Sequence, residues 1–177
     1  MTFKLLVAKI YIGVAVAGAV LLASLGHAEE VKNQDPKIKS AMEVLKASAE
    51  KLGPAKIDGK DNVAGKEVPA IYFGQAKQNN DFTLVDETVK KVGGTATIFV
   101  ASGNEFVRVS TNVKKDDGSR AIGTILDPKG KAIAAIQKGE AFYGDVDILG
   151  KLYTTGYEPI RDGSKAVIGI YYVGYLK

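Results

Sequence analysis

Apolar residues recur at steps of three and four along residues 36–53, the spacing that places them on one face of an α-helix. Pro36 stands where such a helix would begin, and Gly53 stands where it would end. The segment therefore predicts an amphipathic helix whose apolar face packs on a sheet. The residues of that face are Ile38, Met42, Leu45, Ala49 and Leu52.

The remaining chain changes from irregular to strand-like patterns. Residues 54–81 mix Gly, Pro, Asn and Lys with short apolar pieces, which predicts a loop with short strands. A short helix is expected at residues 85–92, ended by Gly93 and Gly94, and another between Asp127, a candidate cap, and Gly139. The predicted strands are residues 95–102, 106–113, 120–126, 142–148, 152–160 and 166–173.

This order of elements indicates the fold class. One helix ahead of an antiparallel meander with helical insertions is typical of an α+β domain. The strand from Ala166 to Val173 is almost continuously apolar, which favours a central position covered on both faces. At 177 residues the chain suits one domain with a substantial core.

The N-terminal segment has the features of an export signal. Lys4 and Lys9 precede an apolar run from Ile10 to Gly26, and the small residues Gly26 and Ala28 fit a cleavage site after Ala28. We therefore expect a signal peptide at residues 1–28 and a single periplasmic or secreted domain at residues 29–177. The run is at the lower limit for spanning a bilayer, so an N-terminal anchor in the inner membrane, with the domain facing the periplasm, is the alternative.

Composition excludes several kinds of chemistry. The chain has no cysteine, and its one histidine, His27, precedes the expected cleavage site. The exported domain could then form no Ser-His-Asp triad, Cys-His pair, usual zinc site or Cys-x-x-Cys-His haem attachment. We therefore expect no enzyme activity, metal or cofactor. The net charge of +4 is not concentrated in a basic block, which argues against nucleic acid as a partner.

Five short motifs occur in an order that resembles the Cache 3/Cache 2 fusion domain family: "RVSTN", "DGSRAIGT", "GEAFYG", "YEPI" and "IGIYYVG". The resemblance implies a PAS-like antiparallel sheet with a long N-terminal helix. It also implies an extracytoplasmic sensor of small molecules in signal transduction or bacterial chemotaxis, often ahead of chemoreceptor or kinase modules. Because no output domain follows the last strand, we expect a freestanding exported domain. A homodimer through the N-terminal helix is a further expectation.

The resemblance also implies a ligand site on the predicted strands. In related sensors of small carboxylic acids an arginine opens the first motif and a polar residue follows three positions later, which here are Arg108 and Thr111. Strict alternation would place these two side chains on opposite faces, so a bulge or strand end near Ser110 is needed. Arg120 is expected to pin the turn by pairing with Asp116 or Asp117. The further candidates for ligand contact are Thr124, Tyr143, Tyr153, Thr155 and Tyr157.

Two functions from different classes fit these residues. The first is an exported sensor domain that binds a small organic acid, whose carboxylate the guanidinium of Arg108 would hold. The alternative is a structural module that binds no ligand and docks on a membrane receptor or kinase. A convergent polar pocket favours the first function, whereas an apolar cleft with an exposed hydrophobic patch favours the second.

Overall fold

The computed structural model describes residues 35–177. The predicted signal peptide, its cleavage after Ala28 and the alternative anchor lie outside the described residues. Within residues 35–177, no helix combines the length and apolar character needed to cross a membrane.

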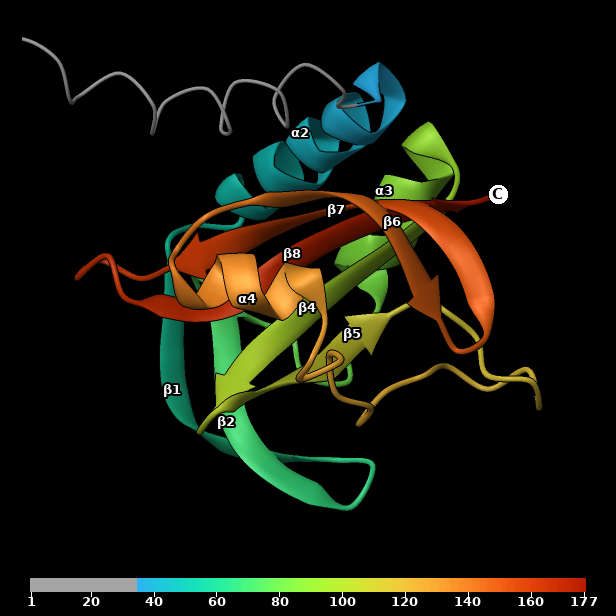
Figure 1. Cartoon of the computed structure of the whole chain (residues 1–177). Helices are drawn as coiled ribbons and strands as arrows, with labels where there is room; N and C mark the ends of the chain where they lie inside the picture. The colour runs from blue at the N-terminus through green and yellow to red at the C-terminus, as the bar shows by residue number, and fades with distance from the viewer. Residues whose placement is uncertain (1–34) are drawn as a thin grey trace, which may run out of the picture. The chain divides into compact units, whose positions relative to one another are not determined.

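Three helices and eight strands form the described part of the chain (Figure 1). The strands make two antiparallel sheets, one of three strands in the order β1-β2-β3 and one of five in the order β5-β4-β8-β7-β6. The α+β class is therefore confirmed. The elements are α2 (Pro36–Glu50), β1 (Ala55–Val63), β2 (Lys66–Phe73), β3 (Ala76–Lys77), α3 (Thr83–Val92), β4 (Thr95–Ser102), β5 (Glu105–Thr111), α4 (Lys131–Gln137), β6 (Phe142–Ile148), β7 (Lys151–Arg161) and β8 (Val167–Leu176).

Helix α2 confirms the amphipathic helix predicted from the apolar spacing. The Asp35 side chain caps its first turn by accepting a hydrogen bond from the backbone N–H of Lys37 at 2.8 Å. Leu45 and its apolar neighbours are buried, whereas Leu52 lies beyond the helix end and is 44% exposed. A longer N-terminal helix, as the family resemblance implies, is not shown, because the residues before Asp35 lie outside those described.

The five-stranded sheet separates two hydrophobic cores. Strand β8 is the middle strand, as its continuous apolar sequence predicts, and successive residues such as Tyr171 and Tyr172 point into different cores. One core is formed with α2, α3 and the β1–β2 hairpin, and the other with α4 and the segment between β5 and α4. The two faces of the sheet therefore contact different cores, and the position of a residue along its strand decides which core its side chain joins.

Two sequence-based predictions of local structure were wrong. Residues 54–81 do not form a loop with short strands, because β1 and β2 make a continuous hairpin through a turn at Ala64 and Gly65, both with positive φ. Most β1 side chains are exposed or half-buried, which hid the apolar alternation. Residues 120–126 do not form a strand, because Gly123 has a φ of 76°; only Arg120 and Ile125 make isolated bridges there.

Candidate functional site

A bulge in β5 sets the direction of the Arg108 side chain. Arg108 pairs with Phe99 and Ser110 pairs with Ile98, so Val109 has no counterpart of its own in β4. The alternation is thereby reset, and Arg108 comes to lie on the same face as Thr111, which pairs with Thr97 beyond the bulge. This confirms that a bulge near Ser110 reconciles the two positions.

The guanidinium of Arg108 is buried without an acidic partner. The residue is 4% exposed, and its Nη1 donates a hydrogen bond to the Thr124 hydroxyl at 2.5 Å. The guanidinium carbon lies 4.9 Å from the centre of the Phe99 ring, a cation–π contact. Its Nε has no hydrogen-bond partner, and no carboxylate among residues 35–177 forms an ion pair with it. Burial lowers the pKa of Arg108, because the charged form has lost its hydration.

A second buried polar group lies beside this arginine. Tyr157 is fully buried, and its hydroxyl has no hydrogen-bond partner. Its ring packs at 4.9 Å from that of Tyr172, whose own hydroxyl is 3.0 Å from the Thr95 hydroxyl. Burial raises the pKa of Tyr157, so the hydroxyl stays protonated and is available as a donor. Native proteins rarely leave such groups unpaired, so these two require an explanation.

Arg108 and Tyr157 open onto the same pocket. The pocket has a volume of about 190 Å³. Its walls come from the middle of β5, the segment before α4, β6 with the turn that follows it, and β7. The lining residues are Arg108, Thr124, Ile125, Leu126, Asp127, Val146, Asp147, Ile148, Leu149 and Tyr157.

The structure brings together three of the seven residues proposed from sequence to contact a ligand: Arg108, Thr124 and Tyr157. Thr111 and Thr155 are buried and do not line the pocket; their hydroxyls bond to the Thr97 hydroxyl at 2.6 Å and to the Gly144 carbonyl at 2.6 Å. The remaining two are Tyr153, which packs against the α4-side core without lining the pocket, and Tyr143.

Tyr143 lies on the opposite face of the sheet from Arg108. It packs against the core formed with α2, and its hydroxyl donates to the carboxylate of Glu158. Lys46 of α2 forms an ion pair with the same carboxylate at 2.6 Å. Burial, together with the bond to Glu158, raises the pKa of Tyr143. Tyr143 therefore helps to hold Glu158 of β7 in place for its ion pair with Lys46 of α2.

Sequence reasoning missed the pocket walls formed by residues 125–127 and 146–149. The expectation that Asp127 caps a helix is wrong, because α4 begins at Lys131 and Asp127 instead accepts a hydrogen bond from the Lys129 N–H at 2.9 Å. Asp147 accepts one from the Gly150 N–H at 2.9 Å. Both aspartates stand in turn-like sequences, "DPKG" and "DILG", which signal a turn without indicating that the two turns meet.

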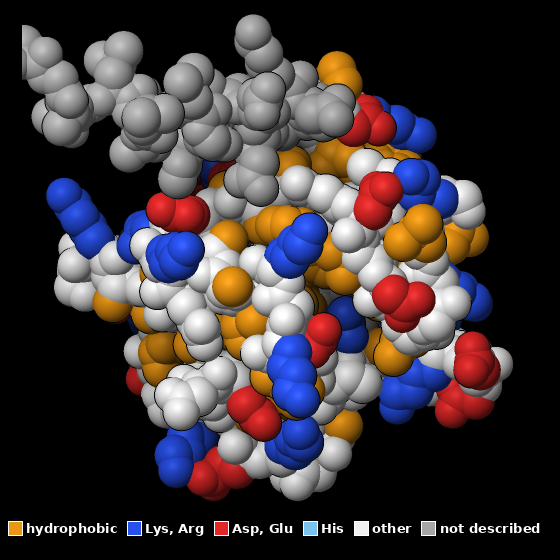
Figure 2. Space-filling view, viewed as in Figure 1, with side chains coloured by type: hydrophobic (Ala, Val, Ile, Leu, Met, Phe, Trp, Pro, Cys, Tyr) orange, Lys and Arg blue, Asp and Glu red, His pale blue; other side chains and the backbone are white. Residues whose placement is uncertain are grey.

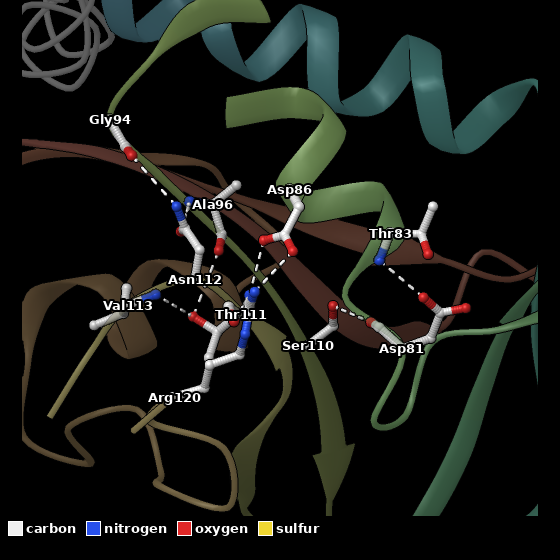
Figure 3. A network of polar contacts seen from close by, with 10 residues as sticks. All are labelled: Asp81, Thr83, Asp86, Gly94, Ala96, Ser110, Thr111, Asn112, Val113 and Arg120. Carbon is white, nitrogen blue, oxygen red and sulfur yellow. Dashed lines mark hydrogen bonds and ion pairs between the residues drawn. The ribbon is translucent and has the colours of Figure 1, made fainter. Parts of the chain in front are cut away.

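The other polar residues of "RVSTN" hold neighbouring segments in place (Figure 3). The Ser110 hydroxyl donates to the Asp81 carbonyl at 2.5 Å, and Asn112 bonds the backbone of Ala96 at 2.8 Å. Arg120 reaches α3, where it makes two hydrogen bonds with the carboxylate of Asp86, at 2.8 and 2.7 Å. Arg120 therefore pins its segment, but its partner is not Asp116 or Asp117 as expected.

Replacing Arg120 with methionine is expected to lower the free energy of unfolding by about 1–2 kcal/mol. The substitution removes the partly exposed ion pair with Asp86 and the hydrogen bond to the Thr111 carbonyl together. Chemical denaturation monitored by circular dichroism measures this change. An unchanged midpoint would show that the Arg120–Asp86 pair does not stabilise the segment.

A larger groove lies on the other side of the domain, between α2, α3 and β3. Its volume is about 350 Å³, and Leu52, Leu84 and Gln78 are among its lining residues. None of the side-chain atoms left buried without a partner in residues 35–177 belongs to its lining residues. The Arg108 pocket is therefore the stronger candidate, although it is the smaller cavity.

The charged side chains of the described residues bear on two other kinds of site, a surface of one charge and a metal site. Basic and acidic side chains are interspersed over the face seen in Figure 2, with no block of one sign. Within the described part of the chain, no group of three or more His, Cys, Asp or Glu residues is arranged to hold a metal ion.

Comparison with known protein families gives a match. The sequence model of the Cache 3/Cache 2 fusion domain matches residues 26–177, which is most of the chain. No curated protein matches the sequence.

Proposed function

The chain belongs to the Cache 3/Cache 2 fusion domain family, and we propose that it is an exported sensor domain that binds a small organic acid through Arg108. Family membership makes it an extracytoplasmic sensor-type domain. The proposal adds the ligand class and the site. It also adds that the chain acts by binding alone, passing its signal to a membrane receptor or kinase.

The observation that carries this proposal is the unpaired guanidinium in the pocket. A buried charge without a partner costs several kcal/mol in a folded protein, so proteins seldom keep one without a use. The planar fork of an arginine matches the two oxygens of a carboxylate. Arg108 and Tyr157 line the same pocket, and each has a buried polar atom without a partner, so the proposal assigns a bound carboxylate as their acceptor.

The pocket also limits the size and charge of the ligand. A volume of about 190 Å³ is below the roughly 300–1,000 Å³ typical of pockets for drug-sized ligands, so the site suits a small molecule. Arg108 is the one basic residue among the described residues that line the pocket, so the lining offers no second cation for a dicarboxylate. A short monocarboxylate suits these walls better than a dicarboxylate.

A thermal-shift screen of the purified protein against short carboxylates tests the proposal. A ligand present at a hundredfold its dissociation constant should stabilise the fold by about 2.7 kcal/mol. The Arg108→Lys variant should bind the same ligand more weakly, because an ammonium keeps the charge and loses the fork. If no carboxylate shifts the melting temperature, the docking alternative gains support.

A further inference from the structure

Two carboxylates line the same pocket as Arg108 without taking part in any ion pair. Asp127 and Asp147 are exposed, so they lie where the pocket opens to solvent. One oxygen of each accepts a backbone N–H of its own turn, and neither is paired with a lysine or arginine of the described residues. The pocket lining therefore combines one buried cation with two exposed anions.

This arrangement discriminates between ligands of different charge. A simple carboxylate that reached Arg108 would bring its negative charge towards two further negative charges. A ligand that also carried a protonated amine would place a cation near Asp127 and Asp147, turning a repulsion into an attraction. Resting on the proposed function, we propose that the ligand is a short amino-carboxylate: its carboxylate meets Arg108, and its ammonium group meets Asp127 and Asp147.

The buried end of the pocket supports a ligand independently of the two aspartates. Arg108 is 4% exposed and Tyr157 is fully buried, and each has a polar atom without a partner. Most of the remaining wall residues are aliphatic, which suits a short carbon chain joining the two charged groups. The wall residues are Ile125, Leu126, Val146, Ile148 and Leu149.

Pairs of ligands that differ only by one amine test whether the pocket prefers amino-carboxylates. Isothermal titration calorimetry of the purified protein compares alanine and 3-aminopropanoate with propanoate, and 4-aminobutanoate with butanoate. At least one amino-carboxylate should bind more tightly than its amine-free partner, by about two- to fivefold for each exposed carboxylate that it meets. Amine-free acids that bind as tightly as every amino-carboxylate would overturn the inference.

Asparagine at the two positions separates the ligand role from a structural one. Asp127→Asn and Asp147→Asn keep the oxygen that accepts the turn N–H and remove only the charge. Each should weaken the best amino-carboxylate by about two- to fivefold and should leave its amine-free partner unchanged or slightly tighter. A structural effect would move both ligands in the same direction, which would contradict the inference.

Asp162→Asn is the matched control for both variants. Asp162 also accepts turn N–H groups, from Ser164 at 2.9 Å and Ala166 at 3.1 Å, and it does not line the pocket. It should alter neither ligand's affinity.

The same measurements distinguish the failure of this inference from the failure of the proposed function. If amine-free acids bind through Arg108 and the aspartate variants change nothing, only the amino-carboxylate assignment is wrong. If Arg108→Lys leaves the binding of every ligand unchanged, the proposed site is wrong.

Discussion

Replacing Arg108 with methionine is expected to make the ligand-free protein more stable while weakening its affinity for the ligand. Methionine keeps an unbranched chain beside Phe99 and has no charge to desolvate. Replacing buried charged groups by apolar residues of similar volume is often neutral or stabilising by 1–4 kcal/mol, and we expect a gain of about 1–3 kcal/mol here. Thr124 keeps a partner after the change, because its hydroxyl donates to the Ala121 carbonyl at 2.7 Å.

The same substitution removes the charge-assisted hydrogen bonds to the ligand. Such bonds contribute about 1.5–3 kcal/mol each, so affinity should fall by roughly ten- to a hundredfold. Urea denaturation and titration calorimetry on one preparation measure the two effects together. A gain in stability together with a loss of affinity would show that Arg108 serves ligand binding and destabilises the ligand-free fold.

Arg161→Met is the control arginine. Its guanidinium bonds to the carbonyls of Lys165 at 2.9 Å and Gly139 at 2.7 Å, away from the pocket. Removing it should lower stability slightly and leave ligand binding intact. If Arg108→Met destabilises the protein by several kcal/mol and keeps its affinity, Arg108 is a structural residue and the pocket assignment fails.

Strand and helix positions were predictable where a segment has one clearly apolar pattern. Strand β4 has the predicted bounds, Thr95–Ser102, and α3 differs from its prediction only by beginning at Thr83. The β1–β2 hairpin was not predictable in the same way, because β1 buries little and its turn uses Ala64, a non-glycine residue with a φ of 51°. An alternating apolar pattern arises where one face of a strand is buried, so strands that remain exposed are not predicted from it.

The site shows a different limit of sequence reasoning. Arg108, Thr124 and Tyr157 could be found because they are polar or aromatic residues on predicted strands or beside them. Asp127 and Asp147 could not, because their place in the pocket depends on the segment before α4 meeting the end of β6. Tyr143 was grouped with Tyr157 although β6 and β7 pair it with Gly156, on the other face. The register between strands decides the face, and one sequence does not contain it.

The substitution Gly169→Ala is expected to have the largest effect on the fold. Gly169 lies in the central strand β8, where a methyl group would come 2.3 Å from the Phe99 carbonyl oxygen and 3.0 Å from the Cδ1 of Ile71. The first contact is with backbone in the middle of the sheet, which cannot move aside as a side chain can. We expect a loss of about 3 kcal/mol or more in the free energy of unfolding, at the upper end of overpacking costs.

Gly163→Ala is the matched control for this change. Gly163 lies in the turn between β7 and β8, and a methyl group there would meet nothing within 4 Å. Its stability should stay within about 0.5 kcal/mol of the wild type, as for ordinary surface substitutions.

The Gly169→Ala variant also tests whether the pocket depends on the packing beneath it. Phe99 contributes its carbonyl to the contact with Gly169 and its ring to the contact with Arg108. A displaced Phe99 should therefore weaken ligand binding even at temperatures where the variant stays folded. Thermal melting followed by titration calorimetry at low temperature separates the two effects. A Gly169→Ala protein with the melting temperature of the wild type would contradict the close packing of β8 against β4. A destabilised variant that kept full affinity would show that the Arg108 pocket does not rely on the Phe99 backbone.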